Sequence, residues 1–354
     1  MIECFASNPF RTLGKMTIIA NANQIYSRLR AAGIDKPYLK RFVLPDWWDD
    51  SVAETKMGFQ ELALRIARAF NIDVGVLLDP EGAIQLSSAR CLFKSNVGSN
   101  KDGFATAVSL SMHAAALAAQ ACSADYVKVE GINPEEIRDS ILCGGASCVG
   151  LAELTKWCWQ NGIPVLHLPE FPNSANKPHG MLLRANGRPV IVVCKNAKFP
   201  AWLLFILAHE LGHLIAGHLE SFDAVVDDSV SEAFSEDNVE EQANRNAIAI
   251  LTGDPNLRFS MTGRWPSAVQ LAQLALQTGH KKSIDPGHVV LNYSHVMGRE
   301  HIAVANAALK QIEGHRNGPQ ILRNILAENL QWQLIPEESA EFLSRVTKID
   351  TSTR

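Results

Sequence analysis

Residues 200–213 read PAWLLFILAHELGH, and this stretch decides the fold of the central part of the chain. Apolar residues continue without interruption to Ala208, and the pattern predicts an apolar helix that carries the motif His-Glu-x-x-His. Residues four apart on a helix lie about 40° apart around its axis, so His209 and His213 can offer imidazole nitrogens to one metal ion. Glu210 lies beside them and is suited to polarise a metal-bound water molecule rather than to bind the metal.

A catalytic zinc site uses three protein ligands and keeps one position open for water, so a third ligand must come from elsewhere. His218 is out of register with the motif HExxHxxGxxH, and on an unbroken helix it points about 180° away from the first histidine. Glu220 is on the correct face but lies about 16 Å along the helix axis. A downstream acidic stretch remains, which a second, antiparallel helix would bring over the first. Spacing alone does not choose between Glu236, Glu240 and Glu241.

Before this helix, short apolar runs replace the helical spacing of apolar residues, and this change predicts a small antiparallel sheet. Residues 164–169 read PVLHLP, and two more apolar runs follow at 179–184 and 189–194. Asn186 and Gly187 lie between these two runs and favour a tight hairpin, because both residues tolerate positive φ. The fold class that we predict is α+β, mostly helical.

The composition is that of a globular protein, with 354 residues, 47% apolar and 20% charged. It excludes a disordered, collagen-like or coiled-coil chain. The net charge of -4 argues against a strongly cationic nucleic-acid binder. Seven cysteines without a CxxC pair are typical of reduced thiols, and neither a secretory signal nor a bilayer-spanning apolar segment is evident. We therefore expect a cytoplasmic protein without a membrane partner.

The N-terminal region carries a short resemblance to a DNA-binding domain. Residues 62–82 read LALRIARAFNIDVGVLLDPEG and resemble the last two helices of a Xre-type helix-turn-helix domain. Residues 1–90 contain eleven Lys and Arg against ten Asp and Glu, so this region has no basic excess. The pattern favours a packing or partner-binding domain, and DNA is a secondary partner in this interpretation.

The central stretch resembles the ImmA/IrrE family of zinc metallopeptidases. Residues 205–218 read FILAHELGHLIAGH, and residues 239–251 read VEEQANRNAIAIL. The family carries HExxH followed by a helix written roughly E-x-x-A-N-x-F-A, and this alignment implies Glu240 as the third ligand of one Zn²⁺ per chain. Asn246 departs from the pattern, where the family usually has an aromatic residue. The resemblance implies a minimal gluzincin-like core flanked by helical regions.

The resemblance also implies a function. Members of the family cut a Xre-type repressor or an antitoxin, which releases genes for stress response, mobile elements or phage defence. An extended substrate would add as a strand to the sheet edge over the metal. A donor for the oxyanion is also required, and the candidates are Tyr293, His295 and His179. His218 and Asn244 are candidates for supporting the metal ligands.

The sequence pattern along the chain, together with this resemblance, divides the protein into four regions. We expect a helical N-terminal domain over residues 1–95, a linking helix over 96–125, a zinc metallopeptidase domain over 126–265 and a helical C-terminal region over 266–354. Residues 91–103 are polar, contain two glycines and indicate a linker.

A second hypothesis is a non-catalytic or latent zinc module that binds a repressor, an antitoxin or DNA. Latency would follow if a thiol such as Cys143 or Cys194 occupied the open zinc position.

Overall fold

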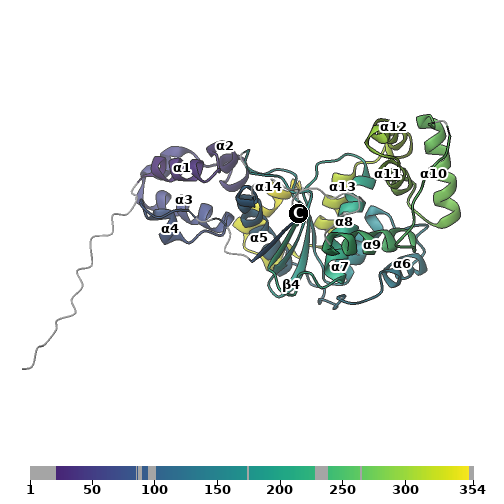
Figure 1. Cartoon of the computed structure of the whole chain (residues 1–354). Helices are drawn as coiled ribbons and strands as arrows, with labels where there is room; N and C mark the ends of the chain where they lie inside the picture. The colour runs from purple at the N-terminus through teal and green to yellow at the C-terminus, as the bar shows by residue number, and fades with distance from the viewer. Residues whose placement is uncertain are drawn as a thin grey trace, which may run out of the picture.

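The computed structural model describes residues 21–84, 86, 90–94, 101–173, 175–227, 238–263 and 265–350. Within this part of the chain the fold is α+β and mostly helical, as predicted. Helices α1–α4 form one end of the molecule and α10–α12 form the other, with a sheet between them (Figure 1). None of the described helices has the length and apolar character that crossing a bilayer requires.

The sheet has five strands among the described residues, in the order β1-β5-β3-β4-β2. The strands are β1 (Cys91–Lys94), β2 (Val165–His167), β3 (Gly180–Ala185), β4 (Arg188–Val193) and β5 (Ala224–Asp227). Strand β3 pairs antiparallel with β4 and β5, whereas β1 pairs parallel with β5 and β2 pairs parallel with β4. The sheet is therefore mixed: the predicted antiparallel pairing holds for β3 with its two neighbours, and it does not hold for the edge strands β1 and β2. The predicted hairpin explains only β3 and β4; the edge strands join through long connections, which permit parallel pairing.

The hairpin between β3 and β4 is confirmed. Ala185 pairs with Arg188, and Asn186 and Gly187 between them have φ values of 49° and 80°. These left-handed conformations are the ones that a two-residue hairpin loop requires.

Strand β1 lies within the stretch that was predicted as a linker, 91–103. Its four residues pair with β5 in parallel, with Cys91 opposite Ala224 and Lys94 opposite Asp227. The linker interpretation is therefore wrong for 91–94, because these residues begin with the apolar run Cys-Leu-Phe and form a short strand beside β5.

Helices cover both faces of the sheet. Helices α8 (Pro200–Ile215) and α9 (Asn238–Thr252) lie on one face, and α5 (Ala105–Gln120) lies on the other (Figure 1). Successive strand residues point to opposite faces, so Leu182 joins the apolar cluster of α8 and α9 while Met181 joins the cluster of α5. This arrangement buries the site-bearing helix α8 inside the protein.

The remaining helices surround this core. They are α1 (Ala22–Ala31), α2 (Lys36–Tyr38), α3 (Lys56–Ala69), α4 (Val74–Leu78), α6 (Pro134–Cys143), α7 (Leu151–Gln160), α10 (Ala268–Lys282), α11 (Pro286–Met297), α12 (Ile302–Glu313), α13 (Gly318–Asn329) and α14 (Glu337–Thr347). One apolar cluster includes residues of α3, α5, β3 and α14, and thus joins the N-terminal helices to the sheet. The domain boundaries at 95, 125 and 265 stay a prediction.

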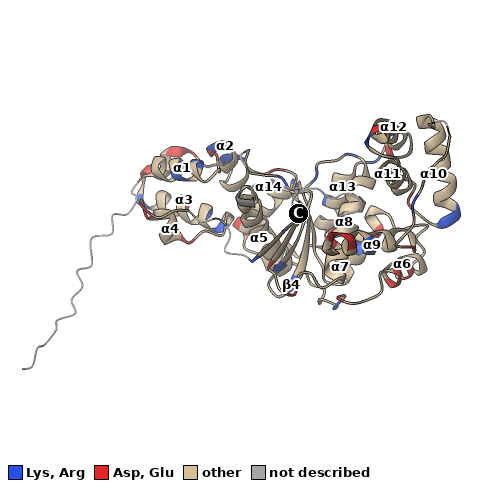
Figure 2. Cartoon of the chain, in the orientation of Figure 1, with Lys and Arg blue, Asp and Glu red and all other residues tan. Residues whose placement is uncertain are grey.

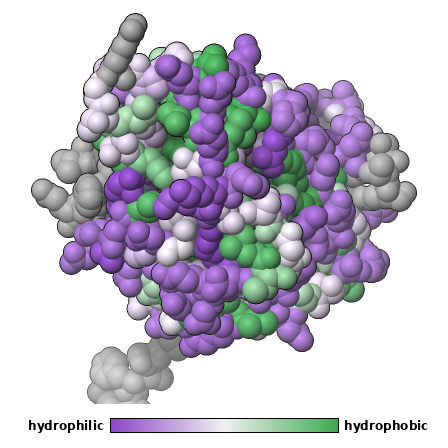
Figure 3. All heavy atoms as spheres, turned by 90° about the vertical axis from the view of Figure 1, so that its right-hand side faces the viewer, coloured by the Kyte–Doolittle hydropathy of each residue, from purple (hydrophilic) through white to green (hydrophobic). Residues whose placement is uncertain are grey.

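The outer surface mixes polar and apolar side chains. Lys and Arg are interspersed with Asp and Glu over α1–α4 (Figure 2). The face seen from the α10 end carries apolar side chains among polar ones (Figure 3). Three apolar residues of α10, Val269, Leu274 and Leu276, are exposed.

Candidate metal centre

Helix α8 brings its two histidines into the interior. Pro200 occupies its first turn, and every residue from Leu203 to Ile215 is buried. Helix α9 crosses α8 at Gly212, where a Cβ would lie 2.5 Å from the carbonyl oxygen of Ala243. Glycine at 212 therefore permits the close approach that places the first turn of α9 over the motif.

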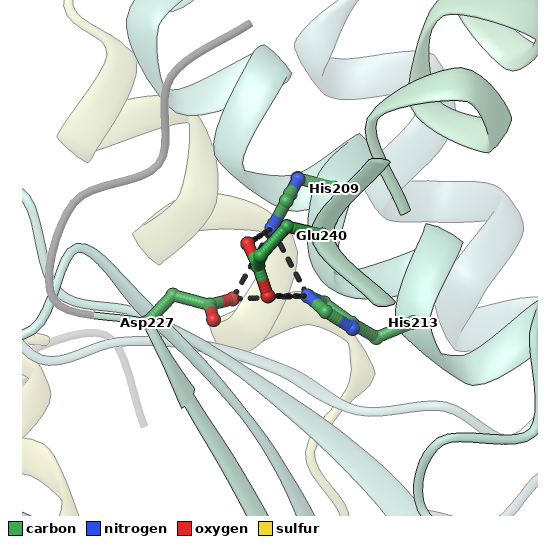
Figure 4. Close-up of side chains that lie close together, drawn as sticks. All are labelled: His209, His213, Asp227 and Glu240. Atoms are coloured by element: carbon green, nitrogen blue, oxygen red, sulfur yellow. Dashed lines mark hydrogen bonds and ion pairs between the residues drawn. The ribbon is translucent and has the colours of Figure 1, made fainter. Parts of the chain in front are cut away.

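The histidines and Glu240 come together as the resemblance implies. The Nε2 atoms of His209 and His213 are 3.0 Å apart. The Glu240 carboxylate lies 3.4 Å from Nε2 of His209 and 3.5 Å from Nε2 of His213. Figure 4 shows these side chains converging on one point from α8 and α9.

Asp227, the last residue of β5, completes the group and has no counterpart among the ligands expected from the sequence. Its Oδ2 atom lies 3.3 Å from Nε2 of His209 and 3.3 Å from Nε2 of His213. The ligand atoms of the four residues all lie within 4.8 Å of one another. No motif spacing relates Asp227 to the helix, and the only sequence signal is an acidic residue that ends the apolar run AVVD.

The residues fit a metal ion. A tetrahedral zinc site with bonds of about 2.0 to 2.1 Å has ligand atoms about 3.3 Å apart. The distances of 3.0 to 3.5 Å among the nitrogens and carboxylate oxygens match that edge. In the described part of the chain, both Asp227 oxygens and Oε1 of Glu240 are buried without a hydrogen bond. Buried carboxylates of this kind require a compensating charge, which a cation would supply.

Hydrogen bonds to Nδ1 orient both imidazole rings. Nδ1 of His209 lies 2.9 Å from Oδ1 of Asn244, which accepts a hydrogen bond from the imidazole N–H. Nδ1 of His213 lies 2.8 Å from Nδ1 of His218, whose Nε2 lies 3.3 Å from Oε1 of Gln242. A proton on each Nδ1 leaves Nε2 unprotonated and directed at the metal position. His218 and Asn244 thus contact the two imidazole rings and lie outside the donor group.

Glu210 lies beside the four donors without joining them. Its carboxyl group packs on Gly180 of β3, where a Cβ would come within 2.1 Å of its Oε1 atom. Burial raises the pKa of Glu210 well above its usual range, and the Asp227 carboxylate raises it further. Burial also disfavours ionised Asp227, but the adjacent His213 and His209 hold the pKa of Asp227 well below its usual range. Glu210 therefore holds its proton more tightly than an ordinary carboxyl group does, and Asp227 holds its proton less tightly.

The comparison with protein families locates this centre in a known domain. Residues 160–278 match the IrrE N-terminal-like domain, Peptidase_M78. The match confirms the resemblance to the ImmA/IrrE family. It covers a third of the chain, from the end of α7 into α10, and contains all four donors and Glu210. The comparisons with curated proteins and with solved structures gave no match.

The three oxyanion candidates lie in different places relative to the IrrE N-terminal-like domain. His179 directly precedes Gly180, and its backbone N–H donates to the carbonyl oxygen of Asp227 at 2.8 Å. Tyr293 is buried on α11, beyond the matched segment, and its hydroxyl lies 3.0 Å from Nδ1 of His301. His295 lies half-buried near the end of the same helix. The backbone bond of His179 to Asp227 places the main chain of this candidate next to a residue of the donor group, and its Nε2 atom lies 3.5 Å from Nζ of Lys195.

The remaining acidic and thiol candidates do not join the donor group. Glu241 lies on α9 but outside the group, and Glu236 lies outside the described residues. Cys194 is buried after β4 and Cys143 is exposed at the end of α6, and neither thiol belongs to the group.

Proposed function

We propose that this chain is a zinc-dependent metalloendopeptidase. The observation that carries the proposal is the convergence of His209, His213 and Glu240 at tetrahedral spacing, with the carboxyl group of Glu210 beside them. Two histidines and a glutamate from a second helix are the ligand set of gluzincin peptidases. The match to a peptidase family domain supports the same reaction class.

When bound, zinc supplies a Lewis acid that activates a water molecule and polarises the scissile carbonyl, and its charge favours the ionised form of Glu210. Glu210 then accepts a proton from the attacking water at its carboxylate and delivers that proton to the leaving amine. Glycine at position 180 leaves room for this carboxylate, because the side chain of any larger residue would fill the same space. Complete burial of Glu210 also keeps bulk water away from its carboxylate.

The substrate that we propose is a protein that binds in an extended conformation. Among the described residues, β1 is the edge strand on the side of β5, and Lys94 at its end pairs with Asp227 of the donor group. A peptide added along this edge would pair with β1, the strand next to β5, through main-chain hydrogen bonds. A Xre-type repressor or an antitoxin fits this class, and its cleavage would derepress stress-response, mobile-element or phage-defence genes.

DNA is the secondary partner in this proposal. Three arginines of the N-terminal helices make contacts within the protein. The Arg28 guanidinium donates to the Val76 carbonyl at 3.1 Å, and Arg65 and Arg68 lie 3.3 and 3.6 Å from the Glu338 carboxylate. These contacts favour a packing role for α1–α4.

The test uses the product of the gene that lies next to the gene for this chain, and it measures cleavage of that product by the purified protein with and without a chelator. Glu210→Gln is expected to keep one zinc per chain and to lower the cleavage rate at least about 100-fold, because a positioned general base contributes roughly that much or more. Glu220→Gln, an exposed carboxylate beyond the end of α8, is the matched control and should cleave normally. Retained cleavage in Glu210→Gln would exclude the mechanism.

A further inference from the structure

The position of Asp227 is unusual for a catalytic centre. Its Oδ2 atom is 3.3 Å from each histidine nitrogen, so it stands in the same relation to the pair as the Glu240 carboxylate at 3.4 and 3.5 Å. Two histidines and Glu240 already form a complete set for catalytic zinc, in which the fourth position is left to water or substrate. The Asp227 carboxylate is a fourth oxygen donor at this centre, and the donor atoms of the four residues lie within 4.8 Å of one another.

The backbone holds Asp227 firmly in this position beside the two histidines. It is the last residue of β5 and pairs with Gly180 of β3, and its carbonyl oxygen accepts the N–H of His179 at 2.8 Å. The residue is 1% exposed. Its side chain therefore points into the centre as a consequence of sheet register, because one position earlier or later along the strand it would face the opposite side.

Both oxygens of the carboxylate are buried, and the described groups that face them are the imidazoles of His209 and His213 and the carboxyl group of Glu210. A buried anion without donors is costly unless a cation or a metal compensates it, and the two imidazoles that face it are also the metal-binding groups. The arrangement is that of a metal ligand rather than that of a residue that orients one.

We propose that Asp227 is a fourth protein ligand of the zinc ion, which closes the coordination position required by the attacking water and keeps the peptidase latent. This inference rests on the proposed metal centre and adds to it a resting state. Latency thus arises from a carboxylate of the sheet rather than from a thiol. Cleavage requires that the Asp227 carboxylate leave the metal so that water can take its place.

The coordination is tested first with cobalt, which replaces zinc and reports its ligands by visible absorption. In the wild-type protein, four protein ligands leave no place for an added anion, so azide is expected to leave the Co²⁺ spectrum unchanged. Asp227→Ala opens one position, and azide is then expected to change the spectrum. A wild-type spectrum that responds to azide in the same way as that of Asp227→Ala would overturn the inference.

Zinc affinity and cleavage give two independent readouts. Asp227→Ala and the isosteric Asp227→Asn are expected to weaken zinc binding at least roughly tenfold, measured by competition with a chromogenic chelator. At saturating zinc they should cleave the neighbouring gene's product faster than the wild-type protein. Glu241→Gln, an acidic residue beside the group but outside it, is the matched control for both. Unchanged zinc affinity in both Asp227 variants would contradict the fourth ligand, and slower cleavage at saturating zinc would contradict latency.

A separate variant distinguishes this inference from the metal centre itself. His209→Ala should abolish tight zinc binding whether or not Asp227 is a ligand. If His209→Ala still binds zinc as the wild-type protein does, the proposed centre fails. If it loses zinc while both Asp227 variants keep full affinity, the inference about Asp227 fails alone.

Discussion

Gly212 of α8 and Ala243 of α9 approach each other so closely that a Cβ at position 212 would lie 2.5 Å from the Ala243 carbonyl oxygen. The same crossing places Glu240, three residues before Ala243, against the two histidines. Helix packing thus controls the geometry of the metal centre, and this relationship yields the first prediction.

Gly212→Ala is expected to push α9 away from α8. Overpacking of this kind costs about 1–3 kcal/mol of unfolding free energy, and it should also weaken zinc binding because Glu240 moves with its helix. Urea unfolding and chelator competition measure the two effects. Gly144→Ala at the end of α6 is the control, because its Cβ would meet its nearest atom at 3.2 Å and its φ of -70° suits alanine. Equal stability of Gly212→Ala and wild type would contradict the prediction.

Gly180→Ala should separate metal binding from cleavage. The added Cβ would meet Oε1 of Glu210 at 2.1 Å and displace this carboxylate, whereas the four donor atoms belong to other residues. We expect one zinc per chain and a kcat lowered at least about 100-fold, in line with the loss of a general base. This prediction is checked by measuring zinc content and cleavage kinetics on the same preparation. A kcat near that of the wild-type protein would show that Glu210 does not need the space beside Gly180.

Asn244→Ala removes the acceptor for Nδ1 of His209. Such supporting hydrogen bonds typically contribute about 10- to 100-fold to metal affinity, so zinc should bind that much more weakly. Asn244→Asp keeps an oxygen at the same place and is expected to restore most of the affinity. The pair of variants is compared by chelator competition at one pH, and equal losses in both would show that packing of Asn244, rather than its hydrogen bond, matters.

A buried glutamate near the start of α8 predicts a pH dependence of stability. Glu313 is 1% exposed and accepts the backbone N–H of Ala201 at 3.3 Å. Burial, together with the charge of Asp285, raises the pKa of Glu313 to about 7. Between the unfolded pKa near 4.5 and about 7, the unfolded chain loses the proton while the folded chain keeps it. The folded state therefore loses stability as pH rises through this window, by about 3 kcal/mol in total from this group.

Glu313→Gln removes this contribution. The amide oxygen still accepts the Ala201 N–H, and the side chain carries no charge at any pH. Urea unfolding at pH 5 and pH 8 should show the variant gaining on the wild-type protein as pH rises. If the two proteins differ in unfolding free energy by the same amount at both pH values, Glu313 does not have the raised pKa assigned to it.

Local patterns were sufficient for the parts of this protein that depend on neighbours in the sequence. The period of a helix places His209 and His213 on one face, and the Asn186-Gly187 pair specifies a hairpin loop. Both features are predictable because their geometry is set within a few residues. The parallel edge strands were not predicted, since their partners arrive after long connections.

The residues of the metal centre show the same difference between local sequence pattern and tertiary structure. The sequence by itself determined the two histidines and the adjacent Glu210, which share one helix, and family resemblance then selected Glu240 from three acidic residues. Only the tertiary structure decided the place of Asp227, because the sheet register and the packing of α8 on that sheet direct its side chain at the histidines. A carboxylate at the end of a strand has no fixed distance in sequence from a helix that it meets in space. That distance is set by the fold as a whole.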